Sequence, residues 1–290
     1  MSDIMIRAAA ADEKVRAFAC DTRELVEQAR IYHDTWPVVT AALGRLLTAG
    51  SMMGTMMKGE KDRLTLKIKG DGEIGGLVVV ADSKGEVKGM AYEPHVRETL
   101  IRPGKMNVGA AVGHGELTVI KDLGLREPYV GAVNLVSGEI AEDLTYYFAE
   151  SEQVPSAVAL GVLVGTDYSV RQAGGFIIQL MPDAGEDIIN EIESRVQKLD
   201  SVTEMLEQGM APADMLDAVL GNLDLQILDE STPVYHCGCS KERMERALLS
   251  LGRKDLQSLY DDGKEVEMCC QFCDGKYMFS HEEVGELLQR

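Results

Sequence analysis

Two short stretches decide the fold of the C-terminal part of this chain: His236-Cys237-Gly238-Cys239-Ser240 and Cys270-Gln271-Phe272-Cys273-Asp274-Gly275. Thirty residues separate the two cysteine pairs. Four thiolates in two tight pairs suit one tetrahedral Zn²⁺ ion with no open position, which is typical of a structural site. The one-residue spacer of the first pair is shorter than the two to four residues usual in zinc sites, and this suggests a second use for the sulfurs. The sequence predicts one zinc ion bound by Cys237, Cys239, Cys270 and Cys273.

Other residues near the two pairs leave alternatives for the ligand set. Cys270 and Cys273 have the common two-residue spacer, whereas Cys269 and Cys273 would have a spacer of three. We favour Cys270 as the ligand and interpret Cys269 as a bystander thiol. His236 and His281 are near enough in sequence to substitute as ligands, although such histidines are more often surface residues.

The composition restricts the class of protein. The chain has 290 residues, 45% of them hydrophobic, and a formal net charge of −19, which argues against nucleic acid and anionic membrane surfaces as partners. It has no apolar run long enough for a transmembrane helix, and its N-terminus does not resemble a signal peptide. We therefore expect a cytoplasmic protein, and in a reducing cytosol clustered cysteines indicate metal ligands rather than structural disulfides.

The charge is uneven and marks three regions. Thirteen acidic and two basic residues between Asp183 and Glu230 give that segment a charge of −11, more than half of the total. We predict an N-terminal body over residues 1–180, an acidic helical linker over 181–230 and a C-terminal zinc-binding domain over 231–290.

The body is predicted to be a largely antiparallel α+β domain, because strands dominate and hairpin signals recur. Residues 63–69 alternate apolar and polar side chains, as in a half-buried strand. Helices are expected over 36–58 and 140–150. Strands are expected over 63–69, 77–81, 87–92, 117–121, 130–135, 157–164 and 176–181.

The linker and the tail are predicted from apolar stripes and capping signals. Ile188, Ile192 and Val196 lie on one helical face, Ser201-x-x-Glu204 is a capping box, and Pro212 suits a first helical position. These helices are short and marginal in isolation, so they must pack against the body or the tail. The tail is expected to hold helices over 242–251, 256–260 and 281–288 and short strands over 266–268 and 276–279.

Three features of the body, a glycine motif, a group of methionines and one cysteine, are interpreted as structural. Gly70-x-Gly72-x-x-Gly75 matches a dinucleotide fingerprint, but the chain continues as a strand and provides no helix N-terminus for a phosphate, so we reject that motif. The methionines at 52, 53, 56 and 57 are interpreted as core residues, with a plastic binding surface as the alternative. The isolated Cys20 is interpreted as a packed, unreactive thiol.

The cysteine chemistry allows a switch. Structural zinc supplies about 10–16 kcal/mol of apparent folding free energy in small domains, so metal loss should unfold the tail. Zinc keeps the sulfurs as thiolates, which is the form that oxidants attack. Two disulfides would use up all four ligands and expel the metal, and the marginal helices of the linker would lose a packing partner.

The spacing of the four cysteines at the end of an acidic chain resembles the thirty-three-kilodalton heat-shock chaperone family of redox-regulated holdases. Two stretches of the body look like signatures of the same family: Tyr146-Tyr147-Phe148-x-x-Ser151-Glu152-Gln153-x-Pro155-Ser156 and Gly174-Gly175-Phe176-Ile177-Ile178-Gln179-Leu180-Met181-Pro182. The resemblance thus covers nearly the whole chain.

The resemblance implies a bacterial cytosolic chaperone without ATP use, and not an enzyme. The reduced, zinc-bound form would be inactive. Oxidation would form the disulfides Cys237–Cys239 and Cys270–Cys273, release zinc, unfold the linker and produce a homodimer that holds unfolding client proteins. Cys269 departs from the four-ligand pattern and makes mispairing possible.

Two other classes of protein are weighed against this one. A constitutive zinc-ribbon adaptor would keep its metal permanently and bind a protein partner. A thiol-disulfide oxidoreductase would use Cys270 and Cys273, but no thioredoxin-like βαβ pattern surrounds that pair.

Overall fold

The computed structural model describes residues 2–97, 100–102 and 105–289. The chain divides into two compact units, Met1–His236 and Cys237–Arg290. Its α+β class, with mainly antiparallel sheets and a helical acidic region, is the predicted one. The functional division at residues 180 and 230 stays a prediction. None of the described helices has both the length and the apolar character that crossing a bilayer requires.

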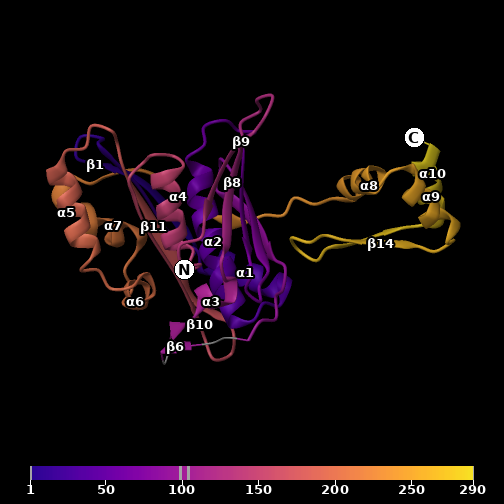
Figure 1. The fold of residues 1–290 in the computed structure, drawn as a ribbon, viewed down its shortest axis with the longest axis horizontal. Coiled ribbons are helices and arrows are strands. Elements are labelled where there is room, and N and C mark those ends of the chain that lie inside the picture. Colours follow the sequence, from indigo (N-terminus) through magenta and orange to yellow (C-terminus); the bar gives the residue numbers. More distant parts are fainter. Residues whose placement is uncertain (1, 98–99, 103–104, 290) are drawn as a thin grey trace. The chain divides into compact units, whose positions relative to one another are not determined.

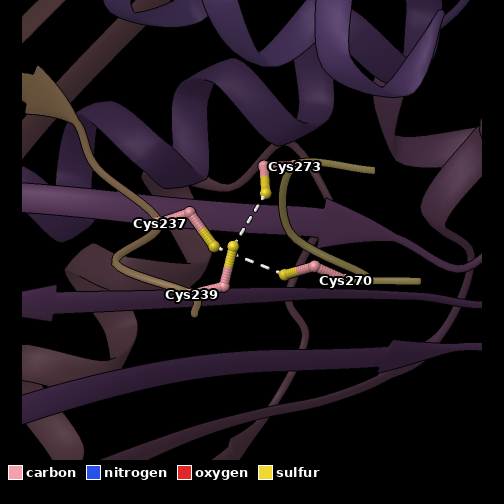
Figure 2. Close-up of side chains that lie close together, drawn as sticks. All are labelled: Cys237, Cys239, Cys270 and Cys273. Atoms are coloured by element: carbon pink, nitrogen blue, oxygen red, sulfur yellow. Dashed lines mark hydrogen bonds between the residues drawn. The ribbon is translucent and has the colours of Figure 1, made fainter. Parts of the chain in front are cut away.

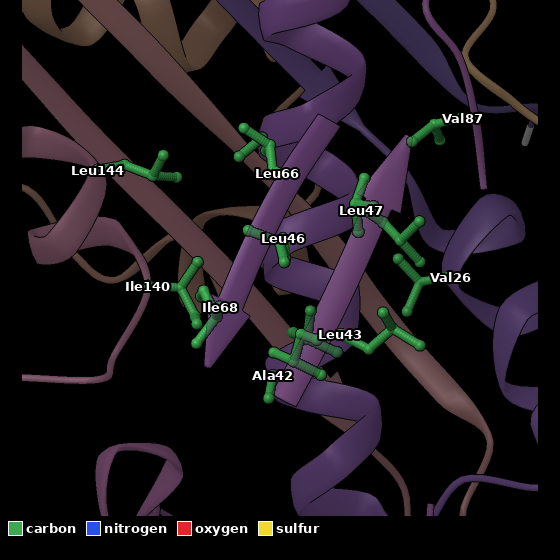
Figure 3. Packing of buried hydrophobic residues seen from close by; sticks show 14 of the residues in the cluster. Val26, Ala42, Leu43, Leu46, Leu47, Leu66, Ile68, Val87, Ile140 and Leu144 are labelled. Atoms are coloured by element: carbon green, nitrogen blue, oxygen red, sulfur yellow. The ribbon is translucent and has the colours of Figure 1, made fainter. Parts of the chain in front are cut away.

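The first unit is organised around one buried helix, α2 (Pro37–Thr55). Seventeen of its nineteen residues are buried, because the helix is apolar on all sides and has small residues where sheets approach it. Figure 3 shows Leu43, Leu46 and Leu47 of α2 among buried side chains of neighbouring elements. Two sheets and the helices α1 (Arg23–His33) and α4 (Ala141–Glu150) share this core.

A six-stranded sheet packs one of its faces on α2. Its order is β13-β5-β4-β3-β8-β9, and every neighbouring pair is antiparallel except β13 with β5. The face toward α2 carries buried side chains such as Leu66 and Val79, as the alternating pattern predicts. The bounds are β3 (Arg63–Gly70), β4 (Gly76–Asp82), β5 (Glu86–Ala91), β8 (Gly115–Asp122), β9 (Tyr129–Asn134) and β13 (Val234–Tyr235).

The strand β13 fixes the end of the first unit to this sheet. The Tyr235 hydroxyl donates to the Gly89 carbonyl at 2.9 Å and accepts from the Gly89 amide at 3.3 Å, and its ring packs against Tyr32. The His236 amide donates to the Val87 carbonyl at 2.9 Å. The chain is therefore anchored directly before Cys237.

A five-stranded antiparallel sheet lies on the other side of α2. Its order is β10-β11-β2-β1-β12. Side chains of one face join the α2 core, and those of the other face, such as Ile6, Phe176 and Ile178, form a second core cluster. The bounds are β1 (Ile4–Ala10), β2 (Val15–Asp21), β10 (Ser156–Val164), β11 (Val170–Leu180) and β12 (Gln226–Ser231).

Three helices of the acidic segment cover this second face: α5 (Glu186–Val196), α6 (Val202–Glu207) and α7 (Pro212–Leu220). Figure 1 shows them on the side of β11 away from α2. The predicted capping box is present, with the Glu204 amide donating to Ser201 Oγ at 3.3 Å and the Ser201 amide to Glu204 Oε2 at 3.0 Å. Their apolar stripes, centred on Ile192, Met205 and Leu216, are thus buried against the body.

The second unit is small. Leu248, Leu256, Phe279, Val284 and Leu287 form its core. It contains α8 (Lys241–Ser250), α9 (Arg253–Asp261), β14 (Val266–Cys269), β15 (Lys276–Phe279) and α10 (His281–Gln289), close to the predicted elements.

The sequence interpretation missed several elements. They include β1, β2 and α1 at the N-terminus, the edge strands β12 and β13, and the short β6 (Leu100–Arg102), β7 (Lys105–Met106), α3 (Val108–Val112) and η1 (Gly221–Leu223). Two motif interpretations are confirmed. Residues 71–75 form a turn that leads into β4 with no helix, and the four methionines lie in or against the α2 core.

Asp143 holds the loop before α4. The residue is fully buried, and its carboxylate accepts four backbone N–H groups. Oδ1 accepts from Val136, Ser137 and Gly138 at 2.7, 3.0 and 3.2 Å, and Oδ2 accepts from Ile140 at 2.9 Å. One side chain therefore pairs the backbone donors of a whole turn.

We predict that Asp143→Ala lowers the unfolding free energy of the first unit by roughly 3–5 kcal/mol, because several buried N–H groups lose their acceptor. Asp143→Asn keeps acceptor capacity and should cost less. Urea unfolding followed by the fluorescence of Trp36, the single tryptophan, measures both changes. The matched control is Glu142→Ala, at an exposed neighbour. Equal midpoints for Asp143→Ala and Glu142→Ala would contradict the role of Asp143.

Candidate metal centre

The first cysteine pair lies in a tight turn directly before α8. Gly238 has φ +59°, a left-handed conformation that glycine adopts without steric cost, and this turns both neighbouring cysteines to the same side. Arg243 Nη1 donates to the Gly238 carbonyl at 2.7 Å, and Ser240 caps α8 through a hydrogen bond from the Arg243 amide at 3.3 Å. The one-residue spacer is therefore compatible with convergent sulfurs.

The second pair lies in the turn between β14 and β15. The Cys270 amide donates to the Gly275 carbonyl at 2.9 Å, and the Asp274 amide donates to the Cys270 carbonyl at 2.9 Å. Asp274 has φ +53°, a region that Asp tolerates better than most residues. The hairpin thus presents Cys270 and Cys273 from one knuckle.

The four sulfurs converge on one point. Figure 2 shows Cys237, Cys239, Cys270 and Cys273 directed toward one another from the two turns. The Sγ atoms lie within 4.8 Å of one another, and the Cys237–Cys270 and Cys239–Cys273 pairs are 3.4 Å apart. A tetrahedron of zinc–sulfur bonds of about 2.3 Å has edges of about 3.8 Å, so the arrangement has the size that such an ion requires. The contacts are longer than the roughly 2.05 Å of a disulfide, so none of the four is joined to another by a disulfide bond.

Tyr277 is a residue of this site that sequence analysis missed. Its hydroxyl lies 3.0 Å from Cys239 Sγ, across 38 residues of sequence. Burial raises the pKa of the Cys239 thiol, but hydrogen bonds from Tyr277 and the other cysteines outweigh it and lower this pKa to about 7. The same contact with Cys239 raises the pKa of Tyr277 to about 12. No local sequence signal marks a tyrosine as a thiolate partner.

Cys237 and Cys273 also have shifted pKa values, and both are raised. Burial raises the pKa of Cys237, and hydrogen bonds to the neighbouring cysteines raise it further. Burial likewise raises the pKa of Cys273 to about 11. Since a metal ion binds thiolates, a bound cation would reverse the preference of these groups for the protonated form.

The alternative ligands fall outside the cluster. Among the residues that the structure describes, the metal-ligand group comprises the four cysteines alone. Cys269 is exposed and its thiol contacts the Asp274 carbonyl at 3.7 Å. The ring of His281 stacks on Tyr260 at 4.1 Å. A cation held here would therefore be bound by four sulfurs.

The surroundings of Cys20, and of Cys270 with Cys273, bear on the other roles that cysteines can have. Cys20 is fully buried in β2, and burial raises its pKa, with the negative charges of Asp21 and Asp3 adding to the effect, as expected for a packed thiol. Cys270 and Cys273 sit in a β-hairpin, whereas a thioredoxin-like pair requires a βαβ context. Neither feature favours an oxidoreductase.

Comparison with known proteins gives a consistent result. The family model described as Hsp33 protein matches residues 3–280. A 33 kDa chaperonin of Agathobacter rectalis is 55% identical over 287 residues, covering 99% of this chain and 100% of the relative. A 33 kDa chaperonin of Lachnoclostridium phytofermentans is 56% identical over 290 residues, covering 100% and 99%.

A solved structure agrees with these relatives. The crystal structure of the 33 kDa chaperonin (heat shock protein 33 homolog) from Thermotoga maritima has a TM-score of 0.90 and 38% identity, covering 99% of this chain and 98% of that one. The names of these relatives are those of chaperones, which argues against an enzyme.

We predict that Cys273→Ser abolishes tight metal binding, because one of four thiolate donors is lost, and that Cys269→Ser binds metal like the wild type. Metal content by atomic emission measures the first effect. Hydrogen exchange should accelerate across residues 237–289 of Cys273→Ser and stay unchanged in the first unit, because we expect the small core of the second unit to need the bound ion. Metal loss in Cys269→Ser with retention in Cys273→Ser would show that the ligand set is wrong.

Proposed function

The chain belongs to the Hsp33 protein family, and on that premise we propose that it is a redox-regulated, ATP-independent holdase. In this proposal the reduced protein binds one Zn²⁺ through Cys237, Cys239, Cys270 and Cys273 and is inactive. Oxidation makes it bind unfolding proteins and prevent their aggregation. The observation that carries the proposal is the convergence of four cysteine sulfurs, within 4.8 Å of one another, in a unit with a small core.

The oxidation step follows from the chemistry of paired thiolates. One thiolate attacks a peroxide oxygen and becomes a sulfenic acid, and its partner displaces water to form the disulfide. Each disulfide thus consumes one peroxide, which takes up two electrons and two protons and leaves as two waters. We propose the pairs Cys237–Cys239 and Cys270–Cys273, in keeping with the family resemblance. All four ligands are then used up, and zinc is released.

The acidic segment is the proposed target of this release. Its helices α5, α6 and α7 bury the apolar outer face of the five-stranded sheet, including Ile6, Phe176 and Ile178. With a charge of −11 and helices of eleven, six and nine residues, the segment gains little stability of its own. Its unfolding would expose an apolar face, which is what a holdase needs to bind unfolded chains.

We accordingly assign residues 1–180 as the client-binding and dimerisation body, 181–230 as the linker and 231–290 as the redox-switch domain. The expected partners are unfolded client proteins and, after oxidation, a second copy of the chain. With a net charge of −19, nucleic acid and anionic membranes are not expected partners, and the cytoplasm is the expected compartment.

We predict that the zinc-loaded protein suppresses aggregation of a heat-labile client only after treatment with peroxide at raised temperature. Light scattering of the client, zinc release and free-thiol count are measured on the same samples. Suppression should appear together with loss of zinc and of four thiols. Equal suppression before and after oxidation would refute the switch.

Matched variants separate the switch from other thiol chemistry. Cys269→Ser should respond to peroxide like the wild type, because its thiol lies outside the cluster. Cys239→Ser cannot close the first disulfide. Its suppression of client aggregation should therefore be the same before and after peroxide. A constitutive zinc-ribbon adaptor would instead retain zinc, and its four thiols would resist peroxide.

A further inference from the structure

The six-stranded sheet has an open edge at β9. Among the described strands, β9 pairs with β8 on one side only. The Leu135 amide donates to the Gly115 carbonyl at 2.8 Å, which fixes the alternation of hydrogen-bonded and non-hydrogen-bonded pairs along the two strands. By that alternation Val130, Ala132 and Asn134 direct their N–H and C=O groups away from β8.

The edge lacks the usual protection against strand pairing. Tyr129–Asn134 contains no charged residue and no proline, although the chain as a whole has a net charge of −19. Val130 is 56% exposed and Tyr129 45% exposed. Exposed apolar side chains continue into the preceding turn at Leu125 and Leu123. An edge of this kind is competent to accept another strand.

A hollow of about 450 Å³ runs beside the open edge. It is lined from β8, β9 and α4 and its C-terminal end by Glu116, Ala132, Val133, Asn134, Tyr146, Glu150 and Ser151. Most of its lining surface is polar, and Tyr146, Ala132 and Val133 supply the smaller apolar part. Glu116 and Glu150 are the charged residues of the lining, and both are exposed. The hollow thus combines open backbone groups, apolar side chains and negative charge.

We propose that the β9 edge binds an extended, apolar polypeptide segment that carries basic residues, as an added strand. Hydrogen bonds to backbone groups do not depend on the side chains of the bound segment, so many sequences can bind. Glu116 and Glu150 select for lysine or arginine beside the apolar residues. The inference rests on the proposed holdase function, since unfolded clients supply such segments.

A second copy of this chain fits the edge less well. Its own β9 is uncharged and would bring Glu116 and Glu150 against the same two residues. Like charges in such a pairing are repulsive. A basic client segment gains attraction from the same residues.

The edge is part of the first unit and does not depend on the acidic helices. Binding of a short segment to the β9 edge is therefore independent of oxidation. This binding is weak. A long unfolded chain gains affinity when the apolar face beneath α5, α6 and α7 is also exposed, because one chain then contacts two sites.

The first test uses a fluorescent synthetic peptide with alternating valine and threonine between two lysines, titrated into the full-length protein. Ala132→Pro removes an outward N–H, and proline is tolerated where the N–H faces solvent at an edge. We expect peptide binding to weaken by about tenfold. Ala132→Ser keeps the N–H and should bind like the wild type. Unchanged binding by Ala132→Pro overturns the proposal.

The second test reverses the charge. Glu150→Lys should weaken binding of the lysine peptide and strengthen binding of the same peptide with glutamates in place of the lysines. Loss of fold cannot produce this inversion. If both peptides bind Glu150→Lys as they bind the wild type, the proposed selection for basic segments is wrong.

Hydrogen exchange identifies the occupant. The peptide should protect the amides of Val130, Ala132 and Asn134 in the zinc-loaded and the oxidised protein alike. Protection that instead grows with protein concentration in the absence of peptide, together with a dimer in sedimentation, would show that a second copy occupies the edge and would overturn the proposal.

The outcome separates this inference from the holdase function. If peptide protects β9 while the oxidised protein fails to suppress client aggregation, the edge site stands and the holdase function falls. If suppression is normal and neither peptide nor client protects β9, the holdase function stands and the edge site falls.

Discussion

The burial of α2 is the constraint on which the rest of the first unit depends. An apolar helix without a polar face requires cover on all sides, and two sheets supply it. The approach is close: a Cβ at Gly44 would lie 2.6 Å from Val26 Cγ1, and one at Gly50 would lie 2.6 Å from Val79 Cγ1. The small residues of α2 therefore set the distance to its neighbours, and this places the outer face of the five-stranded sheet and the open edge at β9.

The second unit, in contrast to the first, has only a small core. Its five buried core residues provide little apolar burial, and its two cysteine turns crowd four sulfurs within 4.8 Å of one another. On the proposed function, the fold of this unit would depend on a bound ion, whereas the fold of the first unit depends on its core. In the proposed switch, oxidation of the four cysteines would release the ion and leave the α2 core intact.

The features that could be predicted from the sequence are those determined by residues close together in the chain. The alternation over residues 63–69, the Ser201 capping box and the spacing of the cysteine pairs each act over a few residues. The N-terminal strands escaped prediction because Ala8, Ala9 and Ala10 have little strand propensity, and their burial comes from pairing with β2 and β12. The contact between Tyr277 and Cys239 is likewise non-local. The regions 98–99 and 103–104 lie outside the described residues.

The anchoring of β13 has a consequence for reversibility. The acidic segment is held at its start by the hydrogen bond from the Met181 amide to the Lys14 carbonyl at 2.8 Å, and at its end by Tyr235 on Gly89. When unfolded, a segment held at both ends has fewer conformations than a free tail of equal length. It therefore loses less entropy when its helices return to the sheet. In the proposed switch, the double anchor would favour refolding of the segment within the same molecule.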